Sequence, residues 1–172
     1  MTRVAAIDCG TNSIRLLVAD GHIDESGRPR LADLTRQMRI VRLGQGVDAR
    51  GYLDPAAIER TVEATVEYQR MIEALGATKT RFVATSATRD ASNSADFVRQ
   101  IKAVIGVEPE VVVGTEEASL SFNGAVSGLG ESVKAPMLVV DIGGGSTELV
   151  LGATRVEQAI SIDMGAVRVT EK

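Results

Sequence analysis

The sequence predicts an α/β protein, in which a complete β-β-β-α-β-α-β-α domain with a mixed sheet is followed by the first strands of a duplicated domain. Three observations support this class. Strand-like apolar runs come in threes near both ends of the chain, helical and strand-like patterns alternate between them, and one strand–turn–strand motif occurs twice. A strand meander followed by α/β alternation is typical of a mixed sheet flanked by helices.

The repeated motif reads "AIDCGTNSIRLLV" from Ala6 and "VVDIGGGSTELVL" from Val139. The two aspartates stand 133 positions apart (141 − 8 = 133). The pairs that keep this offset are Gly10 with Gly143, Ser13 with Ser146 and Leu16 with Leu149. Gly44 and Gly165 also correspond if residues 20–30 are an insertion in the first copy. A repeat this long predicts duplicated domains rather than a solenoid, whose repeats are shorter.

The expected elements follow from periodicity and from turn residues. The first copy is expected to have strands at 3–8, 13–21 and 34–44, with a turn-like insertion at 20–30. Asp54 as N-cap, Pro55 at the first helical position and Gly76 after the last turn bound a helix at 55–75. A strand at 80–87, a helix at 94–105, a strand at 108–114 and a helix capped by Thr115 come next. The strands of the second copy are expected at 135–141, 147–154 and 156–163.

These patterns divide the chain into a first domain at 1–115 and a second part at 116–172, which holds a linking helix and the start of the second domain. The α/β half of the second copy has no counterpart in the sequence, so its strands lack a covering layer. We therefore expect its apolar strand residues to be partly exposed, so that the chain either self-associates through residues 136–172 or leaves these residues mobile. The apolar strand residues are Val139, Val140, Leu149, Val150, Ile160 and Ile162. We also expect the two turns to lack a fixed separation.

Composition excludes several classes of protein. The net charge of −4, the absence of Trp and an aromatic content of 3% argue against a nucleic-acid partner. No apolar run in the sequence approaches the roughly 20 residues of a membrane span, so no membrane partner is expected. The single Cys9 cannot form an internal disulfide, which favours a cytoplasmic location.

The two turns have the composition of phosphate sites. Glycines allow positive φ and leave room for an anion against backbone N–H groups, and hydroxyl side chains add donors. The expected phosphate-binding residues are Gly10, Thr11, Asn12 and Ser13 in the first turn and Gly143, Gly144, Gly145 and Ser146 in the second. Carboxylates beside phosphates repel them, so we expect a bridging Mg²⁺ held by Asp141 and Glu148 with Asp8. The plainer alternative is two glycine-rich hairpins in which Asp only forms a turn.

Four segments together resemble a known family: "DCGTNSIRLLV", "ATSATRDASN", "VVVGTEEASLSF" and "VVDIGGGSTELV". They are similar, in order and spacing, to the exopolyphosphatase and guanosine pentaphosphate phosphohydrolase family of the actin, hexokinase and Hsp70 superfamily. The resemblance implies an actin-like (ribonuclease H-like) fold, of which this chain is the N-terminal part. It also implies a homodimeric hydrolase that releases terminal phosphate from inorganic polyphosphate or guanosine pentaphosphate.

The same resemblance assigns roles to two residues. Glu117 corresponds to the catalytic base, with Glu116 as the competing choice, and Arg89 corresponds to a phosphate-contacting arginine. Arg15 takes the position that Glu148 has in the second copy, and it either lies near the substrate or pairs with a carboxylate. A kinase that transfers phosphate from ATP to a small acceptor, or a phosphate-binding module without catalysis, are the alternative functions. The chain of 172 residues, taken alone, is expected to hydrolyse its substrate very slowly or not at all.

Overall fold

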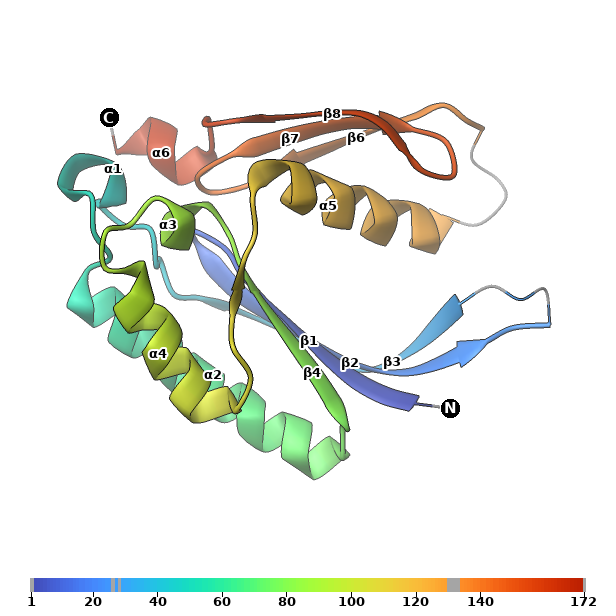
Figure 1. The fold of residues 1–172 in the computed structure, drawn as a ribbon, viewed down its shortest axis with the longest axis horizontal. Coiled ribbons are helices and arrows are strands. Elements are labelled where there is room, and N and C mark those ends of the chain that lie inside the picture. Colours follow the sequence, from blue (N-terminus) through green and yellow to red (C-terminus); the bar gives the residue numbers. More distant parts are fainter. Residues whose placement is uncertain (1, 26, 28, 130–133, 172) are drawn as a thin grey trace.

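The computed structural model describes residues 2–25, 27, 29–129 and 134–171, which form two lobes (Figure 1). The first lobe is built on a five-stranded sheet of order β3-β2-β1-β4-β5. Its strands are β1 (Thr2–Cys9), β2 (Ser13–Ile23), β3 (Pro29–Ile40), β4 (Lys79–Ala84) and β5 (Glu110–Val111). β1, β2 and β3 pair antiparallel, whereas β4 pairs parallel with β1 and β5. The predicted mixed sheet is therefore confirmed.

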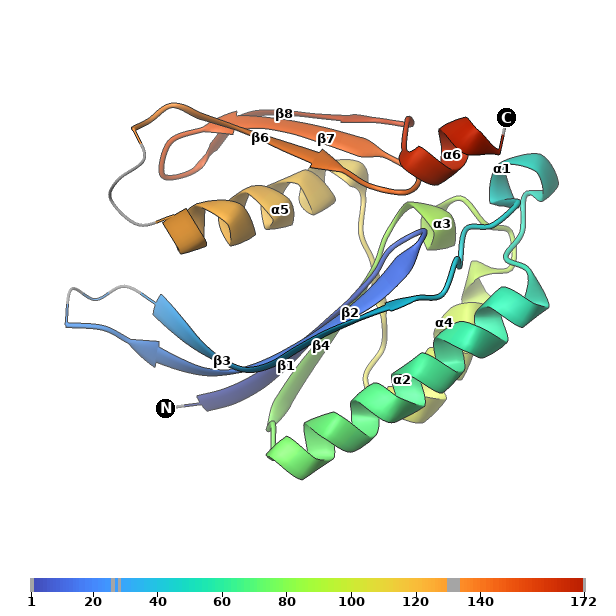
Figure 2. The same cartoon turned by 180° about the vertical axis from the view of Figure 1, so that it is seen from behind.

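Two helices cover one face of this sheet (Figures 1 and 2). α2 (Pro55–Leu75) begins as predicted, because the Asp54 carboxylate accepts a hydrogen bond from the N–H of Ala56 at 2.9 Å. α2 and α4 (Ser94–Ile105) both end at glycines in the left-handed conformation, Gly76 and Gly106. Alternate residues of β1 and β2 point into the core beneath the helices, where they are almost fully buried. The largest core side chains are Tyr68, Phe82, Phe97, Ile7, Ile14, Leu16 and Ile101.

The second lobe consists of α5 (Gly114–Leu129) and a three-stranded antiparallel sheet of order β6-β7-β8. Its strands are β6 (Met137–Ile142), β7 (Thr147–Gly152) and β8 (Val156–Ile162). α5 lies on the sheet face that is turned toward the first lobe, as both ribbon views show. Ala118 and Phe122 of the helix form a small core with Val150. The outer face of the sheet has no described cover, and Leu138, Val140, Ile142 and Ile160 are exposed there.

Several element boundaries differ from the sequence prediction. β2 and β3 extend into the expected insertion at 20–30, which forms the far end of a long hairpin; residues 26 and 28 lie outside the described part. The third strand ends at Ile40, because the N–H groups of Val41 and Arg42 donate to the carbonyl oxygen of Asn12 instead of continuing the sheet. β5 has only two residues. The expectation that Val150 would be exposed is wrong, since α5 covers it.

Two short helices were not predicted, α1 (Val47–Arg50) and α3 (Ser86–Arg89), and a third short helix, α6 (Ala166–Thr170), follows the last strand. α3 replaces the expected end of the strand at 80–87, because the N–H groups of Thr88 and Arg89 turn back to the carbonyl of Thr85. α5 begins at Gly114, one residue before the predicted cap, so Thr115 lies inside the helix. No helix in the described ranges is both long enough and apolar enough to cross a membrane.

Candidate active site

The two glycine-rich turns have the same internal geometry. In the first turn the N–H of Gly10 donates to the carbonyl oxygen of Ser13 at 3.0 Å. In the second turn the N–H of Gly143 donates to that of Ser146 at 2.9 Å. Both pairs keep the offset found in the sequence, so the duplication is present in the fold as well.

The strands that flank the turns also correspond, but their charges do not. Asp8 lies opposite Arg15 between β1 and β2, and Asp141 lies opposite Glu148 between β6 and β7. One register position thus carries a cation in the first lobe and an anion in the second. Arg15 makes no hydrogen bond or ion pair with any described residue, which leaves its guanidinium available to a bound anion.

The glycines of the second turn allow the two turns to pack against each other. A Cβ on Gly144 would lie 2.9 Å from the Cβ of Thr11, and one on Gly145 would lie 2.5 Å from the hydroxyl of Ser86. Thr11 and Ser86 are themselves hydrogen-bonded through their hydroxyls at 2.8 Å. None of the glycines in the two turns has a positive φ. Their role is close approach rather than left-handed backbone, contrary to the expectation of positive φ. The two turns are in contact in this structure, whereas the expectation that their separation is not fixed stays a prediction.

A second pair of glycines packs against the two turns, one glycine on the turn of each lobe. The N–H of Gly44 donates to the carbonyl of Thr11 at 2.8 Å, and a Cβ at Gly44 would overlap the Thr11 side chain at 2.3 Å. Gly165 lies in the same way on Gly144, where a Cβ would come within 2.4 Å of the backbone. Each glycine thus packs on the turn of its own lobe, but Gly165 caps α6 whereas Gly46 caps α1, so the correspondence of Gly44 with Gly165 stays a prediction.

An open hollow lies between the turns. It is open to solvent, and the space that water-sized spheres can occupy within it is small, about 90 Å³. Every predicted site residue lines it except Arg89 and Gly145, and Arg15, Thr85 and Ser86 line it as well. Thr85 and Ser86 were missed as site residues, although they stand in the "ATSATRDASN" segment; no spacing rule showed that α3 would bring them to the first turn. Gly145 lies behind the hollow, against Ser86.

Glu117 reaches the hollow from the first turn of α5, whereas Glu116 points away and pairs with Arg81 at 3.2 Å. Burial raises the pKa of Glu117 to about 7, and the charge of Glu148 adds to this effect. Hydrogen bonds from Arg89 and Thr85 act in the opposite direction. A carboxylate whose pKa lies near neutrality can both accept and hold a proton at physiological pH, as a general base must.

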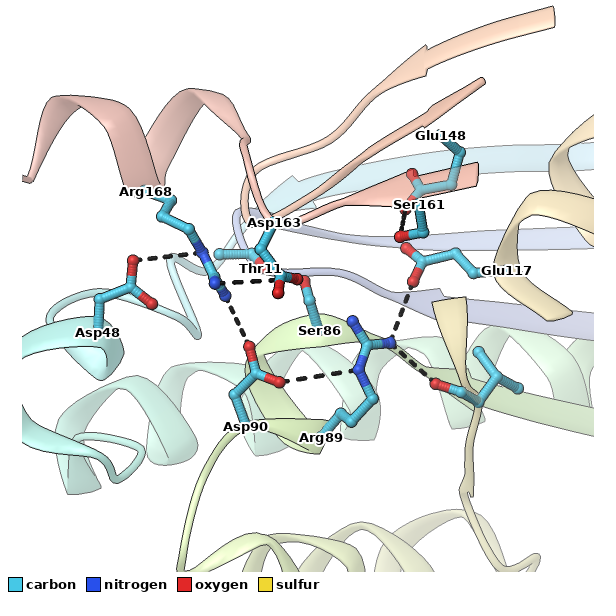
Figure 3. Close-up of polar contacts among 11 residues, drawn as sticks. Thr11, Asp48, Ser86, Arg89, Asp90, Glu117, Glu148, Ser161, Asp163 and Arg168 are labelled. Atoms are coloured by element: carbon cyan, nitrogen blue, oxygen red, sulfur yellow. Dashed lines mark hydrogen bonds and ion pairs between the residues drawn. The ribbon is translucent and has the colours of Figure 1, made fainter. Parts of the chain in front are cut away.

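Arg89 does not point into the hollow. Its Nη1 donates to the carbonyl of Val112 at 3.0 Å and to Oε2 of Glu117 at 3.4 Å, and its Nε lies 3.7 Å from Asp90 (Figure 3). The structure therefore places this arginine beside Glu117 and outside the set of residues that line the hollow. A direct contact with phosphate stays a prediction.

Three carboxylates face the hollow with few partners of their own. Asp141 accepts a hydrogen bond from Ser121 at 2.6 Å, and the nearly fully buried Glu148 accepts one from Ser161 at 2.7 Å. Burial raises the pKa of Asp8, the positive charge of Arg15 partly offsets this effect, and the negative charge of Asp141 adds to it. These groups concentrate negative charge that no nearby side chain fully neutralises.

Magnesium fits this set of donors. In the part of the chain that the structure describes, no three His, Cys, Asp or Glu side chains form a cluster that could hold a metal by themselves. Mg²⁺ is usually bound by only one or two carboxylates, and waters and substrate phosphates complete its shell. Asp141 and Glu148 lie opposite each other on β6 and β7 and supply oxygen ligands of this kind.

The fold and the hollow define a class of protein: a two-lobed, actin-like protein in which matched turns from both lobes line one hollow. The chain matches the model of the Ppx/GppA phosphatase family over residues 21–172. It therefore belongs to this family, and the resemblance found in the sequence is confirmed.

Individual relatives agree with this assignment. The chain is 51% identical over 177 aligned residues to exopolyphosphatase 2 of Mycobacterium tuberculosis, a match that covers 100% of this chain and 55% of the relative. A solved structure described as an exopolyphosphatase-like protein has a TM-score of 0.91 and 46% identity, covering 99% of this chain and 53% of that one. The Aquifex aeolicus family member has a TM-score of 0.81 and 33% identity, with 99% and 54% covered. The chain thus spans about half the length of the relatives it matches.

Proposed function

We propose that this chain carries the phosphate-binding turns and the catalytic base of a hydrolase that releases terminal phosphate from inorganic polyphosphate. One observation supports the proposal above all: Glu117 lies in the same hollow as two matched turns, one from each lobe. The similarity to an exopolyphosphatase of Mycobacterium tuberculosis points to the same substrate.

In the proposed reaction the two turns bind the phosphate chain through backbone N–H groups and the hydroxyls of Thr11, Ser13 and Ser146. Glu117 accepts a proton from the attacking water, the new P–O bond forms at the terminal phosphorus, and the bond to the bridging oxygen breaks. Orthophosphate and a chain shortened by one phosphate are the products. Positioning and electrostatics provide most of the acceleration in reactions of this type.

The proposal includes Mg²⁺ held by Asp141 and Glu148, with Asp8 nearby. When bound, the ion neutralises charge on the phosphate oxygens. These carboxylates would otherwise repel the substrate, so we expect phosphate affinity to depend on the metal. Calorimetric titration of tripolyphosphate in magnesium buffer and in EDTA measures this dependence, and equal affinity in both buffers would contradict it.

The experiment that tests the function is an orthophosphate-release assay on the longest natural polypeptide that carries this sequence. We expect release from short-chain polyphosphate in magnesium buffer. If orthophosphate is released from guanosine pentaphosphate but not from polyphosphate, the nucleotide is the substrate. ATP-dependent phosphorylation of a small acceptor would indicate a kinase, and binding without turnover would indicate a non-catalytic module. A cytoplasmic location and a homodimeric assembly belong to the proposal as well, and fractionation and sedimentation would test them.

A further inference from the structure

A largely buried arginine, Arg168 of α6, contacts the first lobe near the site. Its Nη2 donates to Oδ2 of Asp90 at 2.6 Å, its Nε lies 3.2 Å from Asp48 of α1, and its Nη1 lies 3.9 Å from Asp163. The side chain is 15% exposed, Asp90 is 33% exposed and Asp163 is 75% exposed. Arg168 therefore fixes the second lobe to α1 and to the residue that ends α3.

Asp90 contacts two arginines with its two carboxylate oxygens. Oδ2 accepts the hydrogen bond from Arg168, and Oδ1 lies 3.7 Å from Nε of Arg89. Figure 3 shows Asp90 between the two guanidinium groups, and Arg89 between Asp90 and Glu117. The charges along this line alternate in sign from Asp48 to Glu117, so each group stabilises its two neighbours.

The two contacts that Arg89 makes along this line are its longest, at 3.7 Å to Asp90 and 3.4 Å to Glu117. The bond from Arg89 to Glu117 is 3.4 Å long, whereas charged N–H···O bonds of good geometry are about 2.7–2.9 Å. The bond of the same nitrogen to the carbonyl of Val112 is shorter, at 3.0 Å. A small shift of the Arg89 guanidinium would therefore remove its contact with Glu117 before it removed the contact with Val112.

We propose that Arg168 and Asp90 are positioning residues, which hold Arg89 in place across the lobe interface and thereby align Glu117 in the hollow. The inference rests on the proposed role of Glu117 as the base. Neither residue lines the hollow, so both act through Arg89. Docking of α6 on the first lobe then sets the alignment of the base.

Asp163 provides a matched control. Asp163 and Asp90 both contact Arg168, but only Asp90 also faces Arg89. We expect Asp90→Asn and Arg168→Gln to lower kcat for polyphosphate about tenfold with little change in KM, which is less than the ~10²-fold of a full misplacement. Arg168→Lys should have a kcat between those of these two variants and that of the wild type. A lysine ammonium has no planar fork with which to bind two carboxylates. Asp163→Asn should leave kcat unchanged.

A double-mutant cycle separates positioning from simple adhesion of the lobes. In an Arg89→Gln background, Asp90→Asn should lower kcat no further, because the group through which it acts is absent. Additive losses, or equal losses in the Asp90 and Asp163 variants, would overturn the proposal. A lowered melting temperature with unchanged kcat would overturn it as well, since Arg168 would then only hold the lobes together.

A measurement without turnover keeps this inference distinct from the proposed function. In the 172-residue chain, the ¹⁵N-detected Nε–H signal of Arg89 should shift in Asp90→Asn and stay in place in Asp163→Asn. An unchanged Arg89 signal in Asp90→Asn contradicts the positioning role even if polyphosphate is hydrolysed. A shifted signal in a protein that does not hydrolyse polyphosphate supports the contact and rejects only the proposed reaction.

Discussion

Glu116 and Glu117 are neighbours in the first turn of α5, yet they have different surroundings. Glu117 faces the hollow and is buried enough for its pKa to rise to about 7. Glu116 is exposed and pairs with Arg81. Successive helical residues point about 100° apart, which explains how one of two adjacent carboxylates reaches the site.

We predict that Glu117→Gln lowers kcat for polyphosphate by about 10²–10⁴-fold, the usual contribution of a general base. The amide is similar in size but cannot accept the proton, so tripolyphosphate affinity should change little. Glu116→Gln is the matched control and should retain kcat. Loss of activity in the Glu116 variant with an active Glu117 variant would show that the base has been assigned to the wrong residue.

The raised pKa of Glu117 also predicts a pH dependence of stability. Its pKa is about 7 in the folded chain, against an ordinary value of 4.5. Between these values the folded state binds more protons than the unfolded state, so the free energy of unfolding falls as pH rises. The loss is absent below the unfolded pKa and complete above about 7.

Urea denaturation in EDTA at about pH 5 and about pH 8 measures this loss. Glu117→Gln has no carboxylate at this position and should show a smaller difference between the two pH values. Some difference of the same sign should remain, because the pKa of Asp8 is raised too. An identical difference in variant and wild type would contradict the assignment.

At the residue scale, the sequence predicted the turns well and the groups around them poorly. The constant offset between Gly10 and Gly143 can be found in the sequence itself, because both turns have the same local structure. Arg168 has no such signal. Its partners Asp48 and Asp90 are far away in the chain and come together only through the docking of the lobes. The direction of Arg89 toward Glu117 is equally a product of tertiary packing.

Gly165 illustrates how the elements around the site depend on close backbone contact. Its φ of −133° and ψ of 167° are open to any residue, so the constraint is space and not conformation. A Cβ there would lie 2.4 Å from the backbone of Gly144. We predict that Gly165→Ala destabilises the fold by about 1–3 kcal/mol, as overpacking usually does.

Gly124→Ala makes the same chemical change where there is room. A Cβ at Gly124 in α5 meets nothing within 4 Å. Alanine in a helix interior should stabilise by about 0.5–1 kcal/mol relative to glycine. Chemical denaturation compares the two variants, and a Gly165→Ala protein as stable as Gly124→Ala would reject the close-contact argument.

At the element scale, local signals were sufficient for α2 and insufficient for β3. The start and end of α2 depend on Asp54, Pro55 and Gly76, which act within one turn of the helix. Val41 continues the apolar pattern of the third strand, but its N–H bonds to Asn12 of the first turn. The apolar pattern of a sequence does not show that a backbone N–H will bond to a distant turn instead of to the neighbouring strand. α3 was missed for a similar reason, because its four residues are too few to show a helical period.

At the scale of the whole molecule, the two faces of the second sheet differ sharply. The inner face packs on α5 around Val150 and Phe122. The outer face carries exposed apolar side chains from two strands, Leu138, Val140, Ile142 and Ile160. The order β6-β7-β8 also leaves both outer strands with unpaired edges among the described residues. Open apolar faces beside open edges favour association with another chain.

We predict that the chain of 172 residues self-associates through this outer face. Val140→Lys puts a charge at the centre of β6, opposite Leu149, and should weaken association by at least ~10-fold, since a buried unpaired ammonium is costly. Met38→Lys is the matched control: Met38 is also exposed, at 61%, but lies on β3 of the first lobe. Sedimentation velocity over a range of concentrations measures the association of both variants. A wild-type chain that stays monomeric throughout, or a Met38 variant that disperses as fully as the Val140 variant, would show that the outer face of the second sheet does not drive assembly.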